Sequence, residues 1–83
     1  MSDYHWHLSK QVAEKLLSIR SMRIRRNFVD FFNILADEPD FEDDDWFENS
    51  EGIRFYVRPF NQWAITYQVD HAVKRVNIIF IEP

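Results

Sequence analysis

The sequence predicts an α+β domain of element order β-α-α-β-β-β, in which an antiparallel sheet carries a helical hairpin on one face. Three observations lead to this fold class. Apolar residues alternate near the start of the chain and through its last third, and they recur at helical spacing in between. No helical pattern separates the last strands, so these are expected to pair as antiparallel hairpins. The 83 residues suffice for one core, so residues 1–83 are expected to form a single domain.

A strand and two helices are expected in the first half of the chain. Residues 3–8 alternate between apolar and polar side chains, which is typical of a half-buried strand. Ser9 is a candidate N-cap, and the apolar residues behind it predict a helix over about 10–20. A short break at 21–22 precedes a second apolar stripe, which ends near Ala36.

The second half begins with an acidic segment and continues with three strands. Residues 37–51 hold nine acidic residues and no basic one, with Pro39 among them, so a long loop is expected. Alternation then predicts strands over 53–58, 63–69 and 73–81. The last strand ends in an almost continuous apolar run, which predicts a central strand covered on both faces. The expected core residues are Leu16, Phe28, Phe31, Leu35, Ile65, Tyr67, Ile78 and Phe80.

Composition excludes several classes of site. Cysteine is absent, which excludes disulfides, thiolate zinc sites and cysteine nucleophiles and predicts a reducing, cytoplasmic location. No apolar run approaches the ~18 residues of a membrane helix, which predicts a soluble protein. The single glycine, Gly52, excludes a glycine-rich phosphate loop. A formal net charge of −4 is unfavourable for a protein whose main task is to bind phosphates.

Histidines and acidic residues indicate a metal site only weakly. His5 and His7 share one face of the first predicted strand, but two ligands make half a site. A third ligand would have to come from His71 or the acidic loop, and exposed strand histidines are the simpler interpretation. The acidic run 42–45 lacks the glycine and the spaced ligands of an EF-hand loop. The sequence therefore predicts no metal site and no cofactor.

Arg54, Tyr56 and Arg58 form a more informative group. Strand alternation places them on one face of the strand over 53–58, opposite its apolar residues. Two arginines and a tyrosine on a sheet face indicate either a solvated outer face or a surface that binds an anion. No nucleophilic triad or carboxylate pair stands out elsewhere in the sequence.

The β-α-α-β-β-β order and two short segments resemble the RelE/ParE superfamily of small toxins from bacterial toxin-antitoxin pairs. Those proteins typically show a strand ending in Leu or Val plus Arg, a tight turn, and then aromatic-Arg-aliphatic-x-Tyr-x-Val. The corresponding segments here are Phe55-Tyr56-Val57-Arg58 and Trp63-Ala64-Ile65-Thr66-Tyr67-Gln68-Val69-Asp70. The resemblance implies the same fold and an antitoxin-like protein as partner.

The resemblance also implies which residues would act in an mRNA-cleaving member. Such members use basic residues on the strand before the turn, an arginine three positions before the strand tyrosine, and a C-terminal Arg or His followed by Tyr. Here the strand base is Arg54, and a second such position holds Tyr56. Ala64 replaces the arginine before Tyr67, and the C-terminal pair has no counterpart at Ile81-Glu82-Pro83. The resemblance therefore implies a degenerate nuclease site.

Three functions follow from these observations. The first is a non-catalytic protein that binds an antitoxin-like partner, which fits the missing groups. The second is a ribosome-dependent mRNA endoribonuclease with Arg54, Tyr56 and Arg58 as catalytic residues. The third is a gyrase poison of the ParE type. Independently of these functions, the acidic loop is expected to shield either the Arg54/Tyr56/Arg58 face or the basic corner of Arg23, Arg25 and Arg26 from anions.

Overall fold

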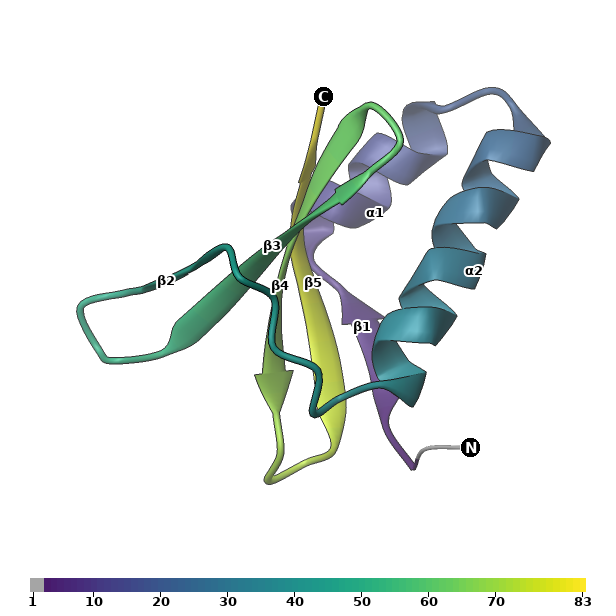
Figure 1. Cartoon of the computed structure of the whole chain (residues 1–83). Helices are drawn as coiled ribbons and strands as arrows, with labels where there is room; N and C mark the ends of the chain where they lie inside the picture. The colour runs from purple at the N-terminus through teal and green to yellow at the C-terminus, as the bar shows by residue number, and fades with distance from the viewer. Residues whose placement is uncertain (1–2) are drawn as a thin grey trace.

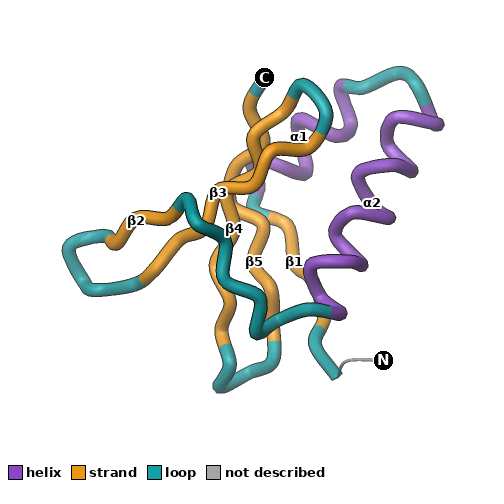
Figure 2. Tube along the Cα trace, viewed as in Figure 1, coloured by secondary structure: helices purple, strands orange, loops and turns teal. Residues whose placement is uncertain are grey.

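Within residues 3–83, which the computed structural model describes, five strands form one mixed sheet and two helices lie on one of its faces (Figures 1 and 2). The strands lie in the order β1-β5-β4-β3-β2. The elements are β1 (His5–Leu8), α1 (Lys10–Ser18), α2 (Met22–Asp37), β2 (Trp46–Glu48), β3 (Arg54–Phe60), β4 (Trp63–Asp70) and β5 (Arg75–Glu82). The predicted α+β fold class, with a helical pair on one face of a sheet, is confirmed.

Each helix starts at a serine cap. The hydroxyl oxygen of Ser9 accepts a hydrogen bond from the Val12 amide at 3.2 Å, and Ser21 accepts one from the Ile24 amide at 3.2 Å. The break expected at 21–22 is thus the cap and first residue of α2, while α1 ends two residues before its expected limit. In the described chain, neither helix is long and apolar enough to cross a membrane.

The first strand runs parallel to its neighbour, so the sheet is mixed and not antiparallel throughout. β1 pairs with β5 in parallel, whereas the β2–β3, β3–β4 and β4–β5 pairs are antiparallel as expected from their hairpins. No hairpin turn connects β1 to β5, because both helices and three strands lie between them in the chain. The direction of β1 is therefore set by the path through α1 and α2, which local sequence patterns do not reveal.

The acidic segment contains a short strand, β2, where a continuous loop was expected. β2 pairs with β3, and the ring of Phe47 stacks on Phe55 at 5.3 Å between centroids. The amide of Val57 also donates to the carbonyl of Asp45 at 2.9 Å. The acidic residues around this strand leave no alternating pattern that would predict it from the sequence. Its two aromatic residues supply the cross-strand contacts that stabilise it.

The core lies between the helices and the inner face of the sheet. Five of the eight expected core residues are fully buried, and Leu16 and Phe31 pack partly buried against them. Phe80 is the exception, with 44% of its surface exposed. Thr66 pairs with Phe80 but Tyr67 pairs with Ile78, so a bulge leaves one residue of β5 without a partner and reverses the alternation there. β5 is therefore covered on one face only, and the expectation of double coverage is wrong.

The helices do not cover the whole inner face. Both helices lie nearest β1 and β5, at one side of the sheet. After α2 the chain turns back across the sheet on its way to β2, which Figure 1 shows as the teal segment between the two elements. The inner face of β3 and β4 is thus met partly by this polar segment, residues 38–45, and this arrangement creates the candidate site.

Candidate functional site

Tyr56 and Arg58 face the inner side of the sheet, so the solvated outer face, one of the two interpretations left open by the sequence, is wrong for them. Tyr56 pairs with Tyr67 and Arg58 with Ile65, and both partners belong to the buried core. Tyr56 itself is buried. The other face of β3 also carries large apolar side chains, so hydrophobicity alone points the wrong face inward. The polar residues can lie inside because the acidic segment supplies charged and hydrogen-bonding partners there.

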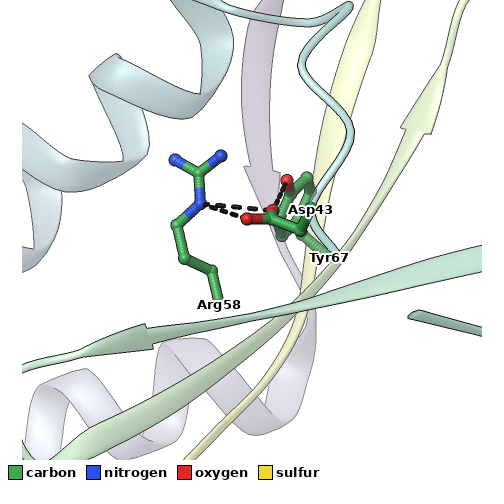
Figure 3. Close-up of polar contacts among 3 residues, drawn as sticks. All are labelled: Asp43, Arg58 and Tyr67. Atoms are coloured by element: carbon green, nitrogen blue, oxygen red, sulfur yellow. Dashed lines mark hydrogen bonds and ion pairs between the residues drawn. The ribbon is translucent and has the colours of Figure 1, made fainter. Parts of the chain in front are cut away.

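The inner face holds a cluster of three polar side chains drawn from three elements. The Arg58 Nε–H group donates to both carboxylate oxygens of Asp43, at 3.0 and 3.2 Å, and the hydroxyl of Tyr67 donates to the same carboxylate (Figure 3). Only 16% of the Arg58 side chain and 13% of the Asp43 side chain are exposed. Because both charges are mostly removed from water, each depends on the other for compensation.

The segment that carries Asp43 is held on both sides of this residue. Before it, the Phe41 ring lies under the Arg58 guanidinium, with 4.6 Å from the guanidinium carbon to the ring centroid. After it, the carbonyl of Asp45 accepts the hydrogen bond from the Val57 amide. The carboxylate is therefore fixed over Arg58 by the segment's backbone and by aromatic packing as well as by charge.

Tyr67 is neutral in this cluster. Burial is the largest cause that raises the pKa of its hydroxyl well above the ordinary value, and the hydrogen bond to Asp43 and the Asp43 charge raise it further. The nearby Arg58 charge opposes this shift but does not cancel it. Tyr67 thus acts as a hydrogen-bond donor to the carboxylate at physiological pH and is not poised to accept a proton.

Arg54 lies at a wetter place on the same strand. Its guanidinium carbon is 3.9 Å from the centroid of the Trp46 ring, and Nη2 is 3.8 Å from a carboxylate oxygen of Glu48. Contact with Tyr56 is the largest cause that raises its pKa, so Arg54 remains charged. Arg54 and Tyr56 border a pocket of about 420 Å³ whose other wall comes from residues 39–42. Arg58 does not line this pocket, so the three predicted site residues do not share one cavity.

The acidic segment lies on the face that it was expected to shield. Asp43 pairs with Arg58 and Glu48 pairs with Arg54, so both arginines of β3 are compensated from within residues 37–51. In the part of the chain that the structure describes, no ion pair joins this segment to the arginines at 23–26. Of the two surfaces considered from the sequence, the segment therefore contacts the sheet face. Whether this suppresses anion binding stays a prediction.

The histidines do not assemble a ligand set. His5 and His7 are exposed on β1, as the alternation predicts, while Nδ1 of His71 lies 2.6 Å from the hydroxyl of Tyr4. Among residues 3–83, no three His, Asp or Glu side chains gather closely enough to hold a metal ion.

Of the three residues in the polar cluster, only Arg58 was predicted from the sequence to be a site residue, and Asp43 and Tyr67 were not. Asp43 is one of nine acids in its segment, and no local pattern distinguishes it from Asp44 or Asp45. Tyr67 was expected in the core, and it is buried there, but its hydroxyl also takes part in the cluster. Strand register would have been the informative signal, because it places Tyr67 beside Tyr56.

Two helices on one face of a mixed five-stranded sheet define a small α+β protein, and on the inner face of its sheet Arg58 lies under the chain's own acidic segment. Comparison with solved structures identifies this fold. The chain is similar to the RelE-RelB complex structure from the archaeon Pyrococcus horikoshii OT3, with a TM-score of 0.75 and 24% sequence identity. The match covers 96% of this chain and 93% of that chain. The chain therefore has a RelE-like fold, and the resemblance found in the sequence is confirmed at the level of the fold.

No protein-family model matches the sequence, and no curated protein matches it either. At this level of identity the likeness is one of backbone architecture. The roles of Arg54, Tyr56 and Arg58 in catalysis, and the degeneracy of the nuclease site, stay predictions.

Proposed function

We propose that this chain is a RelE-like member of the RelE/ParE toxin superfamily that acts by binding a protein partner and does not cleave mRNA. One observation carries the proposal. The Asp43 carboxylate binds both Arg58 and Tyr67, so Arg58 is not free to bind a phosphate oxygen. An RNA phosphate would first have to displace a carboxylate that the segment's backbone holds in place.

The missing groups support the same conclusion. Ala64 stands where the resemblance implies a catalytic arginine, and phosphodiester cleavage needs donors placed at the developing negative charge. Loss of a single such donor costs about 3–4 kcal/mol of transition-state stabilisation. A chain of net charge −4 with nine acids in one segment is also repelled by ribosomal RNA.

The partner is supported by the structural neighbour. That protein was solved as a complex of RelE with RelB, so we infer that an antitoxin-like protein binds this chain as well. Under the proposal the protein works in the cytoplasm, as the lack of cysteine already predicts.

A second candidate function is a ribosome-dependent mRNA endoribonuclease. Arg54 favours it, because this arginine keeps 39% of its side chain exposed and borders the pocket together with Tyr56. In this case Arg54 and Tyr56 would act at the pocket, and Arg58 would act only after Asp43 has moved away.

Overexpression in a bacterial host separates these functions. The proposal predicts no growth arrest when the chain is produced alone. Growth arrest with defined mRNA cleavage would contradict it and support the endoribonuclease. Arrest with DNA damage would instead support a gyrase poison of the ParE type.

A further inference from the structure

The hairpin that joins β2 to β3 projects from the sheet as an arm. Residues 44–53, here called the hairpin arm, are all exposed, and Figure 1 shows them reaching away from the edge of the sheet. The tip of the arm is ordered, because the Asn49 amide donates to the carbonyl of Ile53 at 3.0 Å and the Asn49 side chain accepts from the Glu51 and Ile53 amides. A two-stranded hairpin is only marginally stable by itself, so an arm with a preformed tip is suited to contact with another surface.

The hairpin arm exposes apolar and acidic side chains together. Three large apolar side chains keep more than a third of their surface in water: Trp46, Phe47 and Ile53. Trp46 and Phe47 are neighbours on a strand, so the arm is apolar on both of its faces. Within the described chain, three of its acids form no ion pair: Asp44, Asp45 and Glu51. Two arms do not pair edge to edge, because their acids would repel, so the matching surface is basic.

The connection between the two helices has the opposite charge. Residues 15–26, here called the helix corner, include the basic corner and hold no acidic residue and five basic ones: Lys15, Arg20, Arg23, Arg25 and Arg26. In the part of the chain that the structure describes, none of these five forms an ion pair. Positive charges at the start of a helix oppose its dipole, so the arginines of α2 do not serve its stability. Leu17 and Met22 are also exposed here, by 77% and 72% of their surface, so the corner is both basic and apolar.

The hairpin arm and the helix corner match in charge and in apolar character, but they cannot meet within one chain. The arm continues from β2 at one end of the strand order, whereas the helices lie nearest β1 and β5 at the other end. Figure 1 shows the arm and the α1–α2 connection on opposite sides of the molecule. Among residues 3–83, no ion pair joins the two. Because each chain carries both surfaces, a second copy supplies the complement to each of them.

We propose that two copies of this chain associate about a two-fold axis, with the hairpin arm of each copy docked on the helix corner of the other. Two antiparallel copies side by side bring both arms to both corners, so the association closes at a dimer. The acids of the arm meet Arg23 and Arg26, and its apolar side chains cover Leu17 and Met22. The dimer uses neither Arg58 nor the Asp43 side chain, so it forms whether or not the chain cleaves mRNA.

The helix corner favours this protein arm over a nucleic acid for two reasons. Residues 15–26 contain no aromatic side chain on which a base could stack. Phosphates would compensate the arginines but would leave Leu17 and Met22 in water. The hairpin arm supplies carboxylates and apolar surface at the same time, which the corner requires.

The test is sedimentation velocity of the full chain over a range of protein concentrations. We expect an equilibrium between monomer and dimer, without larger species. Raising the salt concentration from about 0.1 to 1 M shortens the Debye length from about 10 to about 3 Å, so the dissociation constant of the dimer should rise at least about tenfold.

Charge reversal on each surface identifies the contact. Arg23→Glu with Arg26→Glu reverses the helix corner, and Asp44→Lys with Glu51→Lys reverses the hairpin arm. Each double variant by itself is expected to be monomeric, because like charges then face each other. A mixture of the two double variants is expected to dimerise. In the mixed dimer one contact joins an unmodified arm to an unmodified corner, and the other joins two reversed surfaces whose charges again attract.

Two further variants separate net charge from apolar contact. Lys10→Glu with Arg75→Glu is the matched control, because it changes the net charge as much as the corner variant does, at exposed residues that begin α1 and β5. This control should leave the dimer intact. Leu17→Ser changes no charge and should raise the dissociation constant at least about tenfold, since each copy loses a leucine from the contact.

Several results would overturn the inference. A chain that stays monomeric at every concentration has no such contact, and one that forms species larger than a dimer does not close about a two-fold axis. A dimer that persists in either charge variant, or that is lost equally in the Lys10→Glu and Arg75→Glu control, excludes the pairing of arm with corner. Failure of the mixture to dimerise excludes it as well. A monomeric chain whose corner binds oligouridylate RNA would assign the helix corner to a nucleic acid instead.

Discussion

Charged side chains near the two ends of α2 differ in whether they form ion pairs. Beyond its C-terminal end, the acidic segment turns back over the sheet, and its carboxylates meet Arg58 and Arg54. At its N-terminal end, four arginines lie beside exposed apolar side chains and, in the described residues, form no ion pair. The two arginines of β3 therefore help to hold the molecule together, whereas the arginines at the start of α2 have no ion-pair partner among the described residues. Position alone does not make an arginine functional, because its neighbours decide what it can bind.

Both ends of α2 are fixed only if the helix is packed on the sheet along its length, and substitution of its core residue Phe28 tests this packing. Phe28 is fully buried, and its ring packs near Phe60 and Trp63, with centroids 5.2 and 5.4 Å away. Phe28→Ala is expected to lower the free energy of unfolding by about 3–5 kcal/mol, because the cavity cannot refill. Urea unfolding measures this, and Phe31→Ala, at a half-buried position, should cost clearly less. Equal losses would mean that α2 is not seated as described.

Removal of Asp43 tests whether the acidic segment is structural. Asp43→Ala leaves Arg58 mostly buried without a counter-charge and Tyr67 without its acceptor, so the free energy of unfolding should fall by about 2–3 kcal/mol. Asp44→Ala is the matched control, because it removes a neighbouring acid that has no ion pair within residues 3–83 and should cost less than about 0.5 kcal/mol. If both substitutions cost the same, Asp43 has no special place in the fold.

The raised pKa of the Tyr67 hydroxyl predicts how the free energy of unfolding changes at alkaline pH. Its pKa is raised in the folded state, so the folded protein holds this proton more tightly than the unfolded chain does. The stabilisation that comes from this proton is therefore fully present below the unfolded pKa of about 10 and is lost as pH rises above it. Above that pH the folded protein should lose stability, because unfolding releases a proton. Urea unfolding between about pH 8 and 11 should show this fall, and Tyr67→Phe should make it shallower.

The Arg54 pair should show the smallest effect of all. Both side chains are well exposed, 39% for Arg54 and 49% for Glu48, so their attraction is screened by water. Glu48→Gln is expected to leave the urea midpoint unchanged within the precision of the measurement. A loss as large as that of Asp43→Ala would erase the distinction between the buried and the exposed pair.

The sequence predicted the helices and hairpins well, because their signals are local. Serine caps and apolar stripes place α1 and α2, and alternation places β3, β4 and β5. The errors arise where a residue's environment depends on another segment. A bulge opposite Thr66 and Tyr67 turns Phe80 outward, and the sequence of β5 contains no signal that predicts this bulge.

The candidate site was harder to predict for the same reason. Arg54, Tyr56 and Arg58 were identified as a group, but their face depends on which segment covers β3. Asp43 could not be chosen among nine acids until the path of the segment across the sheet was known. Long-range contacts therefore decide the site, while local periodicity decides the elements that carry it.

The most direct test of the account is an mRNA cleavage assay with the purified chain on programmed ribosomes. The account predicts no defined cleavage products, because Arg58 is bound to Asp43 and Ala64 stands in place of an arginine. The Asp43→Ala protein, assayed beside it, separates a blocked site from an absent one. Defined products from the unmodified chain that disappear with Arg54→Ala would contradict the account and establish the protein as an endoribonuclease.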